Sequence, residues 1–116
     1  MKTNRTIDKI RTYNFAERNH WQLMADLSNN DYDIHYFGGR VIENDNFDYF
    51  LQTIEEDNNL EPIEDMIKYL DDQINETSVA INHYYNENNC YNEKYQGCMD
   101  ELLLLIRIVK QEYCED

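Results

Sequence analysis

Apolar residues between positions 62 and 86 recur at helical spacing, and no other pattern in the chain constrains its fold as strongly. The stripe consists of Ile63, Met66, Ile67, Leu70, Ile74, Ile81, Tyr84 and Tyr85. A stripe that keeps to one face for about six turns predicts a long amphipathic helix packed on other elements. Pro62 stands at the start of this segment, where proline is well tolerated in a helix.

Two earlier segments also carry helical signals. Phe47, Phe50, Leu51 and Ile54 follow the i, i+3, i+4, i+7 pattern and predict a helix over 46–57, with Asp45 as its N-cap. A second helix is predicted over 6–28, capped by Thr6 or restarted at Asn14, which has Glu17 three residues later. Its expected apolar stripe is Ala16, His20, Leu23, Met24 and Leu27.

The C-terminal segment 97–113 is apolar on almost every side. Its expected stripe is Met99, Leu102, Leu105, Ile106 and Val109, with Leu103, Leu104 and Ile108 on other sides. A helix of this kind is central in a core or paired in a dimer. Periodicity leaves open that 102–109 is a buried strand.

Residues 32–42 carry the strongest hairpin signal in the chain. Tyr32, Ile34 and Tyr36 alternate with polar residues, and Gly38-Gly39 separates them from a second run, 40–42. The predicted fold is therefore mainly α, a small bundle of about four helices with one short β-hairpin, and an α+β fold is the alternative. We expect a single domain, 1–116, made of a basic helical arm (1–28), the hairpin (32–42) and an acidic helical body (46–113).

The charge of the chain is large and unevenly distributed. The formal net charge is −14, yet residues 1–25 hold five basic and two acidic side chains. Because self-repulsion of this size destabilises a compact chain, we expect the basic arm to lie against the acidic body; the alternative is that the arm touches nucleic acid held by the partner. The same charge disfavours direct binding to nucleic acid or to an anionic membrane.

The cellular location of the protein and its catalytic or ligand-binding activity are predicted mainly from motifs that the sequence lacks. Neither a signal-type apolar segment nor a membrane-length one is visible, and Cys90, Cys98 and Cys114 show no paired spacing, so reduced thiols in the cytoplasm are expected (of a host cell, if a phage encodes the chain). Phosphate loops, zinc-ligand spacings and nucleophile motifs are also missing, and Gly38-Gly39 has no phosphate-loop context. We therefore expect no enzyme, no metal and no cofactor.

Acidic residues are densest between positions 55 and 76, where Lys68 is the only base. A row of carboxylates on a helix has a spacing comparable with that of backbone phosphates, so it fits a basic nucleic-acid-binding groove. The alternative is an ordinary solvated face. Tyr69 is included as an aromatic anchor, and the predicted partner-binding residues are Glu55, Glu56, Asp57, Glu61, Glu64, Asp65, Tyr69, Asp71, Asp72 and Glu76.

In composition the chain resembles phage-encoded anti-defence proteins, including anti-CRISPR proteins, which are short, acidic and rich in Tyr and Asn. The likeness transfers no residue roles; it implies a DNA mimic that inhibits a nucleic-acid-binding enzyme such as a CRISPR effector or a nuclease. The alternatives are an immunity protein or antitoxin that neutralises a basic toxin, and a structural or adaptor helical module. A homodimer through the C-terminal helix is expected if Leu103, Leu104 and Ile108 form one exposed patch.

Overall fold

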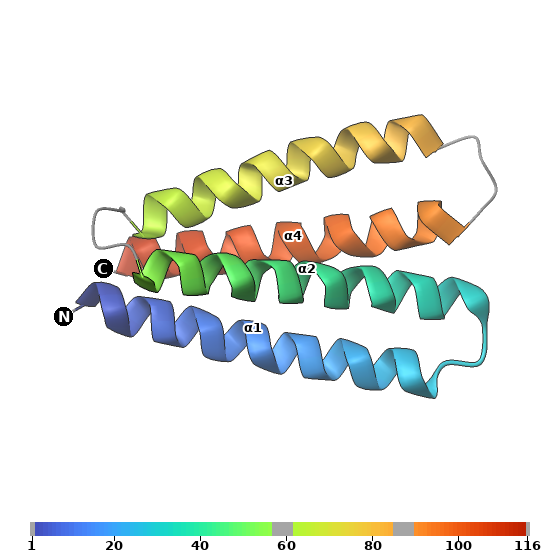
Figure 1. Cartoon of the computed structure of the whole chain (residues 1–116), viewed down its shortest axis with the longest axis horizontal. Helices are drawn as coiled ribbons and strands as arrows, with labels where there is room; N and C mark the ends of the chain where they lie inside the picture. The colour runs from blue at the N-terminus through green and yellow to red at the C-terminus, as the bar shows by residue number, and fades with distance from the viewer. Residues whose placement is uncertain (1, 57–61, 85–89, 116) are drawn as a thin grey trace.

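In the computed structural model the described residues form four helices, which run back and forth along an elongated bundle (Figure 1). They are α1 (Lys2–Leu27), α2 (Asp31–Glu56), α3 (Pro62–Tyr84) and α4 (Cys90–Glu115). The structure describes residues 2–56, 62–84 and 90–115, and the side chains within 7–54, 63–83 and 92–112. A 26-residue helix is about 39 Å long at 1.5 Å per residue, which fits the longest extent of 47 Å.

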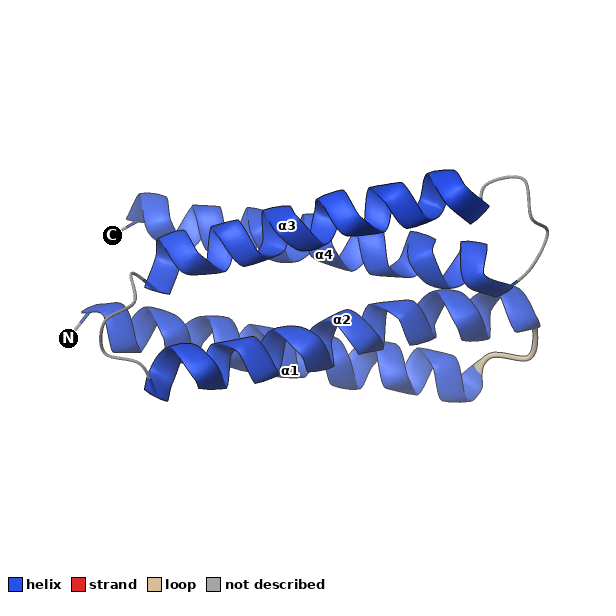
Figure 2. Ribbon diagram, turned by 45° about the horizontal axis from the view of Figure 1, so that its top comes forward, coloured by secondary structure: helices blue, strands red, loops and turns tan. Residues whose placement is uncertain are grey.

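The helices form two antiparallel pairs, α1 with α2 and α3 with α4, stacked as two layers (Figure 2). The largest interface joins the pairs through α2 and α4, which run parallel to each other. Contacts of α1 with α3 and α4 are few. The outer helices α1 and α3 therefore lie on opposite flanks of a central α2–α4 pair.

The core fills the half of the bundle that holds both chain termini. It is formed by Ile7, Ile10, Phe47, Leu51, Ile54, Met66, Leu70, Leu102, Leu105, Ile106 and Val109. The stripes predicted for 47–54 and for the first turns of α3 are confirmed, since Phe47 and Leu70 are fully buried and Phe50 and Ile63 pack on the core. Burial of α4 on more than one side is also confirmed, because it packs on both α2 and α3.

The predicted hairpin over 32–42 is wrong, because these residues are the first turns of α2. Asn30 caps this helix: its Oδ1 accepts the backbone N–H of Asp33 at 2.8 Å, and its Nδ2 donates to the Asp33 carboxylate at 2.9 Å. Acids in the first turn also suit the positive end of the helix dipole. Among the described residues no strand is present and no glycine adopts positive φ.

Close contact between helices explains why the glycines belong to α2. A Cβ at Gly39 would overlap the backbone carbonyl of Lys94, and a Cβ at Gly97 would overlap that of Tyr36. These two glycines let the backbones of α2 and α4 approach more closely than larger residues would allow. Gly38 faces open space, with no atom within 4 Å of the position that a Cβ would take.

Other boundaries also differ from those predicted. Asp45 lies inside α2 and caps nothing, α1 passes through Asn14 without a break, and α4 begins at Cys90 rather than at 97. Residues 102–109 are helix, not strand. The stripe expected for α1 is wrong: Ala16, His20, Leu23 and Leu27 are exposed, while Met24 is half-buried. The buried face of α1 begins instead with Ile7, Ile10 and Asn14.

Candidate functional site

The predicted acidic residues that the structure describes lie along the solvent side of α3. Glu64, Asp71, Asp72 and Glu76 are exposed, and Asp65 is half-buried. From Glu64 to Glu76 the row extends about 18 Å along the helix axis. The side chains of Glu55 and Glu56, at the end of α2, and the whole of Asp57 and Glu61 lie outside the described residues.

Tyr69 lies beside this row but packs inward. Its ring stacks on Phe50 at a centroid distance of 4.2 Å and on Phe47 at 6.2 Å. Burial, together with the negative charges of Glu43 and Glu76, raises the pKa of Tyr69 to about 12. The tyrosine thus helps to fix α3 on α2 and presents only part of its surface beside the acids.

The cations of α1 whose side chains the structure describes are paired with acids of α2 and α4. Lys9 Nζ lies 3.5 Å from the Glu112 carboxylate, and Arg11 Nε lies 3.4 Å from that of Asp48. Arg18 Nε donates to Asp45 Oδ1 at 3.1 Å. The expectation that the basic arm lies against the acidic body is therefore confirmed. This neutralisation takes place on the α1 flank, across the bundle from the acids of α3 (Figure 1).

A buried polar junction joins α1, α2 and α4 at mid-height, and the sequence patterns gave no sign of it. Asn44 Nδ2 donates to Asn14 Oδ1 and to Glu101 Oε2, both at 2.8 Å, and Asn14 Nδ2 donates to the Asn44 carbonyl at 2.8 Å. Arg40 Nε donates to Glu101 Oε1 at 2.9 Å. Hydrogen bonds between residues 30 to 61 positions apart thus offset the cost of burying these side chains, although Asn44 Oδ1 has no hydrogen-bond partner among the described residues.

Electrostatics at the junction are dominated by burial. Glu101 is 0% exposed. Burial and the charge of Glu17 raise the pKa of Glu101 and the hydrogen bonds from Asn44 and Arg40 lower it, so that the pKa lies at about 7. Near neutral pH this carboxyl group therefore changes its charge inside the bundle.

Aromatic rings hold Arg40 in place. Its guanidinium lies 4.0 Å from the centroid of Trp21, a distance typical of a cation–π contact, and Trp21 stacks on Phe37 at 5.4 Å. Arg40 Nη1 donates to the Tyr36 hydroxyl at 2.9 Å, and that hydroxyl donates to the Asp100 carboxylate. Trp21 therefore has a packing role.

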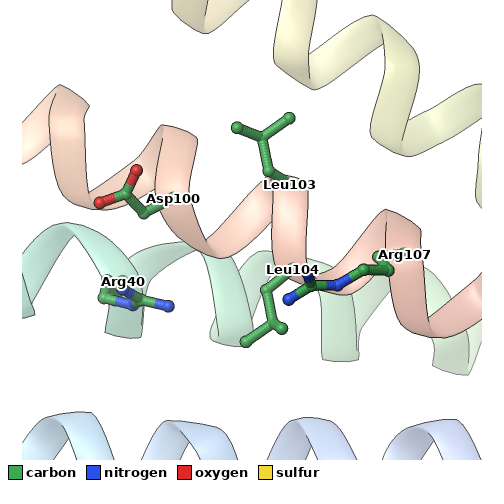
Figure 3. A pocket seen from close by; sticks show the side chains of 5 residues that line it. All are labelled: Arg40, Asp100, Leu103, Leu104 and Arg107. Carbon is green, nitrogen blue, oxygen red and sulfur yellow. The ribbon is translucent and has the colours of Figure 1, made fainter.

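A hollow of about 290 Å³ opens beside this junction (Figure 3). It is lined by Arg40, Asp100, Leu103, Leu104 and Arg107. The lining therefore combines two guanidinium groups, one carboxylate and two leucine side chains. These groups are suited to recognising a surface by charge and shape.

Cys98, on the α4 face toward α2, is poorly suited to nucleophilic chemistry. Its thiol is buried and lies 3.4 Å from the Gly39 carbonyl. Burial, together with the nearby charge of Glu43, raises the pKa of this thiol to about 12. In the described part of the chain no cluster of His, Cys, Asp and Glu could hold a metal ion. None of the described helices has the length and apolarity needed to span a membrane.

Comparison with known proteins gives no further assignment, since no protein family, no curated protein and no solved structure matches the chain.

Proposed function

We propose that the chain is a non-catalytic acidic inhibitor whose α3 face binds the basic nucleic-acid-binding surface of an enzyme. The observation that carries the proposal is the separation of charge between the two flanks. The described cations of α1 are paired with acids of α2 and α4, whereas on α3 Lys68 is the only Lys or Arg. A row of carboxylates that holds a single basic residue attracts a basic groove over long range and speeds association.

The exposed acids provide charge complementarity to a basic groove, and each of them contributes little to the free energy of binding. A single exposed ion pair contributes about 0–1 kcal/mol, so no one substitution should abolish binding. Removing three charges from the row should weaken binding on the order of tenfold and flatten its dependence on salt. Both effects should appear while the fold stays intact if the acids replaced are exposed ones, such as Glu64, Asp72 and Glu76.

The test compares two triple variants that remove equal charge. One carries Glu64→Gln, Asp72→Asn and Glu76→Gln on α3. The matched control carries Asp8→Asn, Asp26→Asn and Asp31→Asn, which are exposed acids of α1 and α2. The immobilised chains capture proteins from a bacterial lysate, and a short DNA duplex is then used for elution, because a partner bound through its nucleic-acid surface must be displaced by DNA.

The parent chain and the control should retain a DNA-eluted protein that the α3 variant loses. Equal capture by both variants, with the same salt response, would show that the α3 acids are only a solvated surface. A basic protein that is captured through α3 but not displaced by DNA would favour the alternative of an immunity protein or antitoxin.

A further inference from the structure

The solvent side of α4 carries an ordered stripe that the core does not use. Its residues, here called the outer stripe, are Gln96, Asp100, Leu103, Leu104, Arg107 and Gln111. They lie at i, i+4, i+7, i+8, i+11 and i+15, so they share one face of the helix. Leu104 is half-buried and the other five are exposed.

Two side chains of the outer stripe make few contacts with the described residues of the same copy. Arg107 makes no hydrogen bond or ion pair with any described residue, although the chain has 24 acids and 10 Lys or Arg residues. Leu103 is 49% exposed at the edge of the hollow in Figure 3. Of the three leucine and isoleucine side chains expected to form an apolar patch, only Leu103 is exposed, since Leu104 and Ile108 are half-buried.

The outer stripe is complementary to itself when read in the opposite direction. About a point midway between Leu103 and Leu104, Asp100 stands opposite Arg107, and Gln96 stands opposite Gln111. A twofold dimer requires this property, because residue i of one copy contacts j of the other while j contacts i. In two antiparallel α4 helices, leucine would therefore lie opposite leucine, Asp100 opposite Arg107, and Gln96 opposite Gln111.

We propose that two copies of the chain associate through their outer stripes, with the α4 helices antiparallel. The Arg107 guanidinium of each copy binds the Asp100 carboxylate of the other. Asp100 can accept it because the Tyr36 hydroxyl occupies only one carboxylate oxygen, Oδ2. Leu103 of each copy packs on the leucines and against the hollow of the other copy, beside Arg40.

The association should be weak and should depend on salt. The stripe covers about 22 Å of one helix, which is small beside the roughly 800 Å² that each partner buries in a standard interface. A charge of −14 on each copy opposes association until salt screens it. A dissociation constant on the order of 10⁻⁵–10⁻⁴ M follows, so sedimentation equilibrium of the full chain from 10 µM to 1 mM in 0.15 M salt can detect the dimer.

Charge reversal gives a test with an internal rescue. Asp100→Arg places arginine opposite arginine, and Arg107→Asp places aspartate opposite aspartate, so each variant alone should dimerise at least tenfold more weakly. An equimolar mixture of the two variants restores both acid–arginine contacts and should form a heterodimer at least as stable as the parent dimer. Asp72→Arg and Lys68→Asp on α3 make the same changes in net charge away from the stripe, and they should leave dimerisation within a few-fold of the parent.

Three results would overturn the proposal. The first is a parent chain that remains monomeric up to 1 mM. The second is a dimer that both single reversals leave intact, which would place the interface elsewhere. The third is loss of the dimer in each variant without recovery in the mixture, provided that circular dichroism shows both variants to be folded.

Discussion

Replacement of Glu101 by glutamine should change how the stability of the protein depends on pH. Glu101 is 0% exposed, and burial raises its pKa from the ordinary 4.5 to about 7. The folded chain therefore holds a proton that the unfolded chain has released between these two pH values. A raised carboxyl pKa means that stability is fully present below 4.5 and is lost as pH rises through 7.

The size of the effect follows from the same pKa difference. At about 1.4 kcal/mol per pKa unit, ionising Glu101 in the fold costs about 3 kcal/mol at pH 8 relative to acid conditions. Because the chain has a pI of about 4.4, solubility favours starting the measurement at pH 5.5. About 2 kcal/mol of the cost then falls between pH 5.5 and 8. Glutamine does not titrate, so Glu101→Gln should gain this amount relative to the parent across that interval.

Urea unfolding followed by circular dichroism at 222 nm measures this difference at each pH. Asp72→Asn, which removes one exposed charge from α3, shows what the loss of a single negative charge does by itself. Parallel stability curves for the parent and Glu101→Gln would refute the reasoning. A parent chain that gains stability relative to Glu101→Gln as pH rises would show that pairing with Arg40 outweighs burial.

The remaining predictions concern the contact between α2 and α4. Gly39→Ala should lower the free energy of unfolding by about 1–3 kcal/mol, since the added Cβ would overlap the Lys94 carbonyl. Gly38→Ala should raise it by about 0.5–1 kcal/mol, because no atom lies within 4 Å of the added Cβ. If urea unfolding showed that both variants are destabilised by the same amount, the close packing at Gly39 would be contradicted. Burial raises the pKa of the Cys98 thiol to about 12. Iodoacetamide at pH 8 should therefore alkylate this thiol only as fast as the bundle opens, which peptide mass spectrometry can follow. Immediate labelling of Cys98 in the folded chain would contradict this prediction.

Sequence periodicity predicted the elements whose burial is apolar. The stripe of α3 and the residues from Phe47 to Ile54 were identified because hydrophobic residues dominate their inner faces, where Thr77 is the buried polar residue of α3. Elsewhere the inner face is partly polar, and periodicity then misleads. In α1 the helix buries Asn14 and leaves Leu23 and Leu27 exposed, because Asn14 finds partners on α2.

The hairpin prediction failed for a related reason. The alternation from Tyr32 to Tyr36 and the glycine pair are local signals, and they favour a two-residue turn. The structure is decided by distant residues: Arg40 pairs with Glu101 across 61 positions, and Gly39 packs on the backbone of Lys94. Neither contact can be inferred from neighbouring residues in a single sequence. Gly39, which favours a turn locally, here allows the close contact between two helices.

Of the candidate sites, the sequence indicated the acidic row on α3 but not its contrast with the α1 flank, which depends on ion pairs formed only in the fold. That contrast also separates the two proposed interactions physically. Binding of the α3 acids to a basic groove is attractive at long range, so salt weakens it. Association of two copies through α4 brings together two bodies that each carry a charge of −14. Moderate salt screens this repulsion and also the attraction of the two Asp100–Arg107 ion pairs. Because the repulsion is the larger of the two, moderate salt favours the dimer. Opposite responses to salt therefore distinguish an inhibitor that acts through its acids from a chain whose main partner is itself.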